Sequence, residues 1–213
     1  MTITPGRAKR RMDRIPNPLS IFGAIAGSDA PSNDGGKRVS EANPLDRFVM
    51  PDVLDVCCGT RMMWMDKNDE RAVFVDKRTE SFSIAPGRAH KNGAVLNVAP
   101  DQEADFTALP FDDETFHHVV FDPPHHTSKR LGKTGTGVME KKYGRLGDDW
   151  REMLADGFSE CFRVLKPKGT LIFKWCETEI PLSEILKLTP EKPLYGHKSG
   201  KKAQTHWVAF LKA

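Results

Sequence analysis

Five short apolar runs constrain the fold of this chain more than any other feature of its sequence. They occupy residues 53–59, 72–75, 94–98, 116–121 and 170–175. Apolar runs of this length, bounded by Gly, Pro and Asp, are typical of buried strands. Residues 148–165 repeat apolar side chains at intervals of three and four, which predicts a helix that ends at the breakers of 166–169. Strands that alternate with helices predict an α/β fold with a parallel sheet covered on both faces.

Near the end of the chain, residues 182–188 predict a short helix and residues 206–211 a final strand. That strand is expected to pair with Leu194 and Tyr195 across a basic turn. Upstream, residues 1–50 differ from the rest. They carry a basic run (Arg7, Lys9, Arg10, Arg11 and Arg14), and 27–45 are rich in Gly, Ser, Asp, Asn and Pro. We therefore expect a largely flexible N-terminal arm over 1–50, either solvated or in contact with phosphates, and one domain over 51–213.

The formal net charge of +3 is a near-cancellation between regions of opposite sign. Residues 52–126 hold seven basic and fourteen acidic side chains, whereas 127–147 hold six basic and one acidic. The last 22 residues, 192–213, hold five basic and no acidic side chains. Two basic patches thus follow an acidic first half, which favours a polyanionic partner for the later loops.

Several classes of protein are disfavoured by composition. The four cysteines are too few and too irregular for a disulfide scaffold, and the absence of C-x-x-C spacing argues against structural zinc. Free thiols suit a reducing, cytoplasmic location. The apolar stretch 21–27 is too short to span a membrane, and no signal-peptide pattern precedes it. No metal site is expected, and His117 and His118 are interpreted as structural residues of a strand.

Polar groups gather where the predicted strands end. Asp55 and Gly59 follow the first strand, and Asp76 ends the second. Ligands of parallel sheets bind at the carboxyl ends of strands, where an acid such as Asp76 can accept hydrogen bonds from ribose hydroxyls. Farther on, Asp105 and Phe106 offer a carboxylate for an exocyclic amine and a ring to pack on a base. This order of residues predicts a nucleoside pocket.

The fourth strand ends in Asp122, Pro123, Pro124 and His125. Two prolines stiffen the backbone and remove two N–H donors, so the carbonyls and the Asp122 carboxylate can accept from an NH2 group. His125 either stacks on the target or accepts its proton, since its unperturbed pKa is about 6.5. His126 is a further candidate for substrate contact. C5 methylation of cytosine is set aside, because it needs a nucleophilic cysteine, usually after a proline, and the chain has no Pro-Cys pair.

These segments resemble class I S-adenosylmethionine-dependent methyltransferases over most of residues 51–213. The matching segments are LDVCCGT (54–60), FVDKR (74–78), ADFTALPFDDETFHHVVFDPPH (104–125) and RVLKPKGTLIFKW (163–175). The resemblance implies a Rossmann-like, three-layer α/β/α fold whose sheet is mostly parallel with an antiparallel C-terminal strand. It also implies S-adenosylmethionine as cofactor. The implied contacts are Asp55, Cys57 and Gly59 with its methionine part, Asp76 with the ribose, and Asp105 with Phe106 at the adenine.

Within that family, D-P-P-H is similar to the D-P-P-[YF] or N-P-P-[YF] element of amino-methyltransferases acting on adenine, guanine or glutamine. The likeness is closest to small enzymes encoded by phages and prophages. Two departures stand out: His125 replaces an aromatic residue, and Cys57 and Cys58 replace part of a glycine-rich turn. The implied catalytic residues are Asp122, Pro123, Pro124 and His125.

The basic patches supply candidate substrate contacts. They are Lys129, Arg130, Lys133 and Tyr143 in the first patch, and Lys198 and Lys201 in the second. We expect a nucleic-acid substrate whose exocyclic base amine is methylated; a duplex base would have to be flipped out. Three alternatives stay open: methylation of a protein glutamine or small amine, a non-catalytic binding module that keeps the fold, and cleavage of the cofactor itself.

Overall fold

The computed structural model describes residues 50–87, 91–127, 137–198 and 204–213. All of these except Met50 belong to one compact unit, Pro51–Ala213. The predicted arm over 1–50 lies, apart from that one residue, outside the described ranges. The strands are β1 (Val53–Asp55), β2 (Ala72–Asp76), β3 (Glu80–Ile84), β4 (Ala94–Val98), β5 (Gln102–Glu103), β6 (Phe116–Phe121), β7 (Leu165–Cys176), β8 (Tyr195–Lys198) and β9 (Thr205–Leu211).

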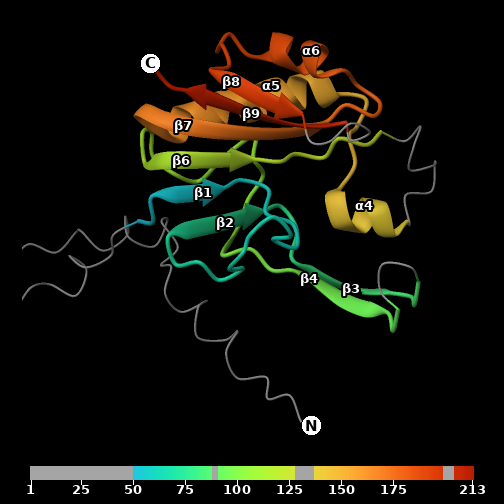
Figure 1. Ribbon diagram of the computed structural model, residues 1–213. Helices are drawn as coiled ribbons and strands as arrows, with labels where there is room; N and C mark the ends of the chain where they lie inside the picture. Colours follow the sequence, from blue (N-terminus) through green and yellow to red (C-terminus); the bar gives the residue numbers. More distant parts are fainter. Residues whose placement is uncertain (1–49, 88–90, 128–136, 199–203) are drawn as a thin grey trace, which may run out of the picture. The chain divides into compact units, whose positions relative to one another are not determined.

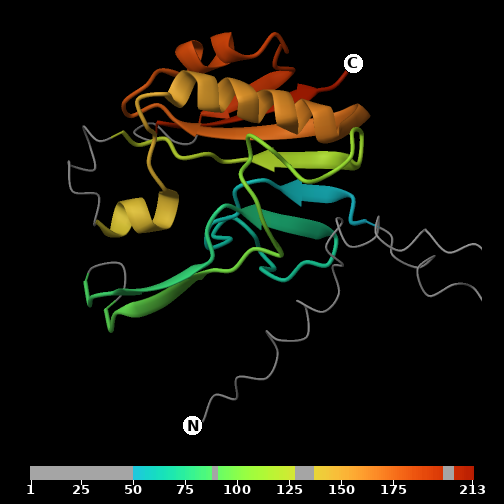
Figure 2. The same ribbon diagram turned by 180° about the vertical axis from the view of Figure 1, so that it is seen from behind.

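The helices of the described ranges are α4 (Val138–Tyr143), α5 (Trp150–Val164), α6 (Leu182–Ile185) and the 3-10 turn η2 (Leu186–Leu188). None of them is long and apolar enough to cross a membrane. Only α5 exceeds two turns, and the connection from β1 to β2 runs through 56–71 without a helix. The helical layers of the predicted α/β/α arrangement are thus reduced in the described part of the chain, where α5 supplies most of the helical cover (Figure 2).

Seven strands form the main sheet in the order β5-β2-β1-β6-β7-β9-β8 (Figure 1). The pairs β1–β2, β1–β6, β2–β5 and β6–β7 are parallel. The C-terminal strand β9 runs antiparallel between β7 and β8. This confirms the predicted Rossmann-like sheet, mostly parallel with an antiparallel C-terminal strand.

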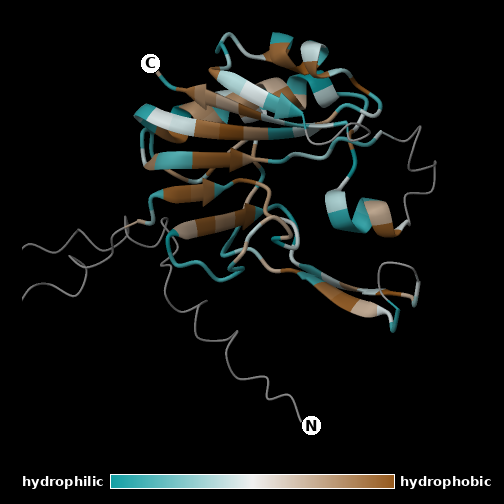
Figure 3. Cartoon of the chain, viewed as in Figure 1, coloured by the Kyte–Doolittle hydropathy of each residue, from teal (hydrophilic) through white to brown (hydrophobic). Residues whose placement is uncertain are grey.

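The two faces of the sheet differ because strand side chains alternate. Along the second half of β7, every second residue from Gly169 to Trp175 is buried, and the residues between them are only half-buried. Leu171, Phe173 and Trp175 therefore share one face. α5 packs on this face, where Phe158 lies with its ring centroid 4.9 Å from that of Phe173. The apolar central strands stand out in Figure 3.

The opposite face carries the polar strand-end residues. Asp55 aligns with Phe74 on β2 and with Val120 on β6, and Val120 aligns with Ile172 on β7. Asp76, Asp122 and Lys174 each follow one of these aligned residues by two positions. Period-two alternation consequently puts Asp55, Asp76, Asp122 and Lys174 on one face at one end of the sheet. The fold itself assembles the site.

Residues 94–98 form a strand as predicted, but not in the main sheet. They pair antiparallel with β3 in a separate two-stranded hairpin that extends away from the sheet (Figure 1). The strand beside β2 is instead the two-residue β5. The β3–β4 hairpin therefore occupies part of the connection that leads from β2 to the edge of the sheet.

Candidate functional site

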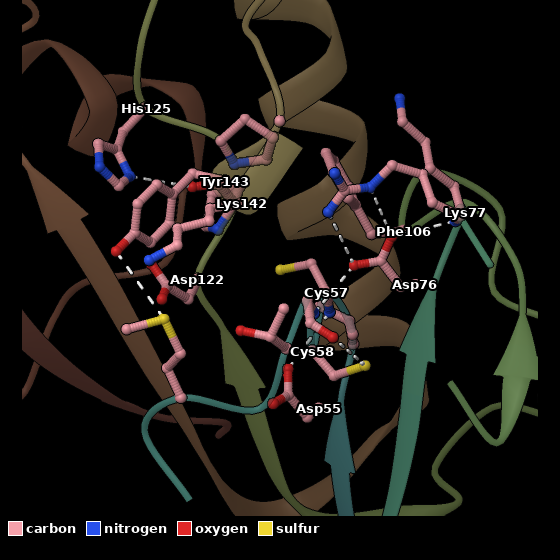
Figure 4. Close-up of a pocket in the computed structure, with 18 of the residues that line it drawn as sticks. Asp55, Cys57, Cys58, Asp76, Lys77, Phe106, Asp122, His125, Lys142 and Tyr143 are labelled. Carbon is pink, nitrogen blue, oxygen red and sulfur yellow. Dashed lines mark hydrogen bonds and ion pairs between the residues drawn. The ribbon is translucent and has the colours of Figure 1, made fainter. Parts of the chain in front are cut away.

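One cleft opens where β1, β2 and β6 end, and ten of the predicted site residues line it. These are Asp55, Cys57, Gly59, Asp76, Phe106, Asp122, Pro123, Pro124, His125 and Tyr143. Figure 4 shows Asp122, His125 and Tyr143 on one side of the cleft and Asp76, Lys77 and Phe106 on the other, with Cys57 between them. Residues from five separate segments of the sequence thus converge at this end of the sheet, as ligand sites of parallel sheets do.

Asp55 is a buried carboxyl whose contacts come from its own turn. One oxygen accepts from the Cys57 N–H at 3.3 Å, and the other accepts from the Trp64 indole N–H at 2.7 Å. Burial raises the pKa of Asp55 to about 7, although the Trp64 hydrogen bond opposes the shift. The turn then bends at Gly59, whose φ of +50° lies in the left-handed region that favours glycine. A carboxyl held in this way suits a cationic ligand group.

Asp76, at the end of β2, binds the turn that follows β1. Its Oδ2 accepts from the Gly59 N–H at 2.9 Å, and its Oδ1 accepts from the backbone and Nε of Arg78, each at 3.0 Å. Arg78 also donates to the Lys141 carbonyl of α4 at 3.0 Å. The second strand end is thereby tied both to the turn after β1 and to the helix on the far side of the cleft.

Phe106 and Asp105 are placed differently from each other. Phe106 is buried, its ring centroid lies 5.2 Å from that of Phe121, and it lines the cleft. Asp105 is not among the lining residues; it accepts from the N–H and hydroxyl of Thr107 at 3.1 and 3.0 Å, and Lys77 Nζ lies 3.8 Å from its other oxygen. Asp105 therefore caps a turn beside the cleft.

Asp122 pairs with a residue that sequence reasoning missed. Lys174 Nζ donates to its Oδ2 at 2.5 Å, and both side chains are about four-fifths buried, with exposures of 22% and 18%. Burial raises the pKa of Asp122, and the charge and hydrogen bond of Lys174 lower it. The available signal was a lysine near the end of the otherwise largely apolar run 170–175.

His125 stands beside three rings. Its centroid lies 4.4 Å from that of His126, 6.0 Å from that of Tyr143 and 6.1 Å from that of Trp175. Its Nδ1 lies 3.4 Å from the Pro123 carbonyl oxygen. Burial lowers the pKa of His125 to about 4, so the ring is neutral at pH 7. A neutral imidazole at the cleft can both stack and accept a proton.

Helix α4 is fixed against the prolines by the residues that follow it. Gly144 has a φ of +72°, and a Cβ built there would lie 2.9 Å from Pro124 Cγ. Two residues later, the Leu146 N–H donates to the His126 carbonyl at 2.9 Å. These contacts hold Tyr143 over the cleft, where its hydroxyl donates to Met62 Sδ at 3.9 Å.

His126 is buried away from the cleft lining. Its Nδ1 lies 3.2 Å from Glu179, whose second oxygen accepts from the Thr127 N–H at 3.3 Å and from the Thr127 hydroxyl. Glu179 is a second residue that the sequence did not indicate. This cluster anchors the chain directly after D-P-P-H and does not bring His126 to the lining.

Lys198 lies outside the cleft at the end of β8, where its Nζ donates to Glu177 at 2.6 Å. Register puts it at the same end of the sheet as the cleft, because His197 aligns with Trp207 and Trp207 with Lys174. The remaining candidates, Lys129, Arg130, Lys133 and Lys201, fall outside the described residues. Among the residues that are described, no three His, Cys, Asp or Glu side chains form a group that could hold a metal ion.

Comparisons with known proteins give structural likeness only. No protein-family model matches, and no curated protein matches. Solved structures with a similar fold include a SAM-dependent methyltransferase from Methanosarcina mazei, at 14% identity and a TM-score of 0.40, covering 80% of this chain and 97% of that one. Another is the 1,6-didemethyltoxoflavin-N1-methyltransferase of Burkholderia thailandensis with bound S-adenosylhomocysteine, at 13% identity and a TM-score of 0.44, covering 76% and 70%. What this chain does has to be inferred from its own cleft.

Proposed function

We propose that this chain is an S-adenosylmethionine-dependent methyltransferase that methylates an exocyclic amine of a nucleic-acid base. One observation carries the proposal: Asp55, Asp76 and the D-P-P-H segment line a single cleft at one end of the sheet. Asp55 and Asp76 suit the binding of a nucleoside that carries a cationic side chain. The D-P-P-H segment suits the binding of an amine. A donor and an acceptor held in one cleft react as if at very high concentration.

The residues of the cleft fit the proposed cofactor. Asp55 is a buried carboxyl with no cation paired to it among the described residues, so the α-ammonium of a methionine moiety would complement its charge. Asp76 would accept from ribose hydroxyls, and Phe106 would pack on the adenine. When bound, S-adenosylmethionine supplies a methyl group activated by its sulfonium.

The opposite wall fits the acceptor. The Asp122 carboxylate accepts a hydrogen bond from the amine and so fixes the direction of the nitrogen lone pair. The amine becomes acidic as its nitrogen gains the methyl group. The neutral ring of His125 then accepts the released proton, which it can pass to solvent because its conjugate acid is strong. The Pro123–Pro124 backbone keeps both side chains in place.

A nucleic-acid acceptor is favoured by lysines on both sides of the cleft. Lys142 and Tyr143 line the cleft from α4, and Lys77, with a half-exposed side chain, lines it from the end of β2. Lysines beside an aromatic ring match a phosphate backbone and a stacked base. The basic stretches on either side of Tyr143 and after Lys198 extend the same charge in sequence.

Transfer of tritium from labelled S-adenosylmethionine into separate DNA, RNA and protein fractions tests the proposal. We expect label in a nucleic-acid fraction, with Asp122→Ala abolishing transfer while calorimetry shows retained cofactor binding. Asp76→Ala should weaken cofactor binding, and Asp112→Ala, at an exposed aspartate outside the cleft, should change neither. Label in protein alone would move the acceptor to a glutamine or similar amine, and cofactor binding without transfer to any fraction would contradict the catalytic assignment.

A further inference from the structure

Lys174 is the one lysine of the β7 run that enters the cleft. It lies on the face that carries Asp55, Asp76 and Asp122, and it lines the cleft with them. Its Nζ contacts Asp122 Oδ2 and also lies 5.6 Å from the ring centroid of Trp207, its register partner on β9. The ammonium therefore contacts a carboxylate and also lies near an indole ring, as in a cation–π arrangement.

Several of the residues that surround Asp122 in the cleft carry no positive charge, so the Lys174 ammonium matters for the ionisation of Asp122. From β1 and its turn, Asp55 and Cys57 face the same cleft, and neither brings positive charge. Asp122 and Asp55 oppose each other's ionisation. His125, which follows Asp122 on its own segment, is neutral at pH 7.

On α4, Lys142 and Tyr143 line the same cleft, but no described contact joins either of them to Asp122. Among the described residues Lys174 is thus the cation that pairs with this carboxylate. Its bond engages only Oδ2, and no described residue donates to Oδ1.

We propose that Lys174 is a positioning residue of the acceptor site, which holds Asp122 ionised and turned so that its Oδ1 accepts from the acceptor amine. The inference rests on the proposed function, because it assigns Asp122 to the acceptor. It adds a requirement that D-P-P-H alone does not contain: the acceptor site needs a residue from β7. An ionised Oδ1 accepts a stronger hydrogen bond than a neutral carboxyl does.

Loss of the cation has a definite pH signature. Without Lys174, no cation opposes the effect of burial on Asp122, so the pKa of this carboxyl rises further and the ionised fraction falls at neutral pH. Each unit of that rise lowers the ionised fraction about tenfold below the pKa. Raising the pH restores the carboxylate.

The first test is the pH profile of kcat/KM for wild type, Lys174→Met and Lys174→Arg, with Lys187→Met as a control at an exposed lysine paired with Glu184. We expect Lys174→Met to lose at least about tenfold at pH 7 and to regain most of this by pH 9. The kcat/KM of Lys174→Arg should stay within about threefold of the wild-type value, and that of Lys187→Met should equal the wild-type value. A loss of equal size at every pH, or no loss, would overturn the proposal.

A second test needs neither cofactor nor acceptor. The protein is labelled with 13C at aspartate carboxyls, and the Asp122 signal is assigned by its absence in Asp122→Asn. We expect its titration midpoint to rise by at least one pH unit in Lys174→Met, or in Lys174→Gln should the methionine variant not fold. An unchanged midpoint would overturn the inference even if methyl transfer is found. A raised midpoint without methyl transfer would instead contradict only the proposed function.

Discussion

Three aspartates on one face of the sheet have been given different environments by single neighbouring residues. Asp55 is buried with an indole and a backbone N–H, so its pKa is raised to about 7. Asp76 is equally buried but is paired with Arg78. Asp122 has Lys174. At the residue scale, the polarity of the cleft is therefore set by which acid has a cation beside it, and Asp55 is the acid that lacks one among the described residues.

Asp55→Asn should stabilise the ligand-free protein at alkaline pH. A carboxyl whose pKa is raised on folding contributes most at low pH, and this contribution is lost as the pH rises through the folded value of about 7. A shift of three units corresponds to about 4 kcal/mol at most. Because the unfolded carboxyl already ionises above its ordinary pKa of 3.8, part of this gain is present at pH 5. We expect the variant to gain roughly 1–3 kcal/mol in unfolding free energy at pH 8 and less than half of that at pH 5, measured by urea denaturation.

The same substitution should weaken cofactor binding, because an asparagine side chain at this position carries no charge to meet an ammonium. Calorimetry at pH 8 would measure this as at least a tenfold rise in Kd, the effect of about 1.4 kcal/mol. Asp112→Asn serves as the control, since Asp112 is exposed and is not one of the residues that line the cleft. Equal stability gains at pH 5 and pH 8 would contradict the assigned burial of a charge.

At the scale of elements, the sequence predicted the strands that carry the site and the sheet they form. Buried runs such as β2 and β6 are local in sequence, and so are the acids at their ends. The partner of 94–98 was not predictable in this way, because β3 alternates weakly and a strand pattern does not reveal its sheet. Lys174 and Glu179 were missed for a related reason: each acts through a residue about fifty positions away.

Gly144→Ala should loosen the attachment of α4 to the prolines. The new Cβ would meet Pro124 Cγ at 2.9 Å, and φ of +72° is unfavourable for alanine. We expect a loss of about 1–2 kcal/mol in stability and faster hydrogen exchange of the Leu146 N–H, which donates to His126. The rate of methyl transfer should also fall, because Tyr143, which lines the cleft, is the last residue of the same helix.

Gly137→Ala is the matched control at the other end of α4. A Cβ there would meet no described residue within 4 Å, and its φ of −74° suits any residue. In this variant, the hydrogen-exchange rate of the Leu146 N–H and the free energy of unfolding should equal those of the wild type. If both alanine variants behave alike, the contact between Gly144 and Pro124 does not hold the helix.

At the scale of the whole molecule, the small net charge of +3 results from acidic and basic residues that are concentrated in different parts of the chain. The acidic first half of 51–213 contributes Asp55, Asp76 and Asp122 to one face of the sheet, and the basic patches come from segments that follow D-P-P-H and β8. Among the described residues, the buried acids Asp55, Asp76 and Asp122 and the lysines Lys77 and Lys142 line the same cleft. Under the proposed function, a polyanion would contact these lysines at the rim of the cleft while an uncharged base enters between the acids.

This arrangement predicts steep salt dependence of nucleic-acid binding. Each phosphate that a lysine neutralises on a single strand contributes about −0.7 to the slope of log K against log salt concentration. Lys142→Ala should therefore reduce the magnitude of the slope by about 0.7 for a single-stranded oligonucleotide, measured by fluorescence anisotropy from about 50 to 200 mM salt. Lys187→Ala, which removes an exposed charge paired with Glu184, should leave it unchanged. A slope near zero for the wild type would show that the rim does not bind phosphates, and an acceptor without phosphate, such as a protein side chain, would then fit the same acids.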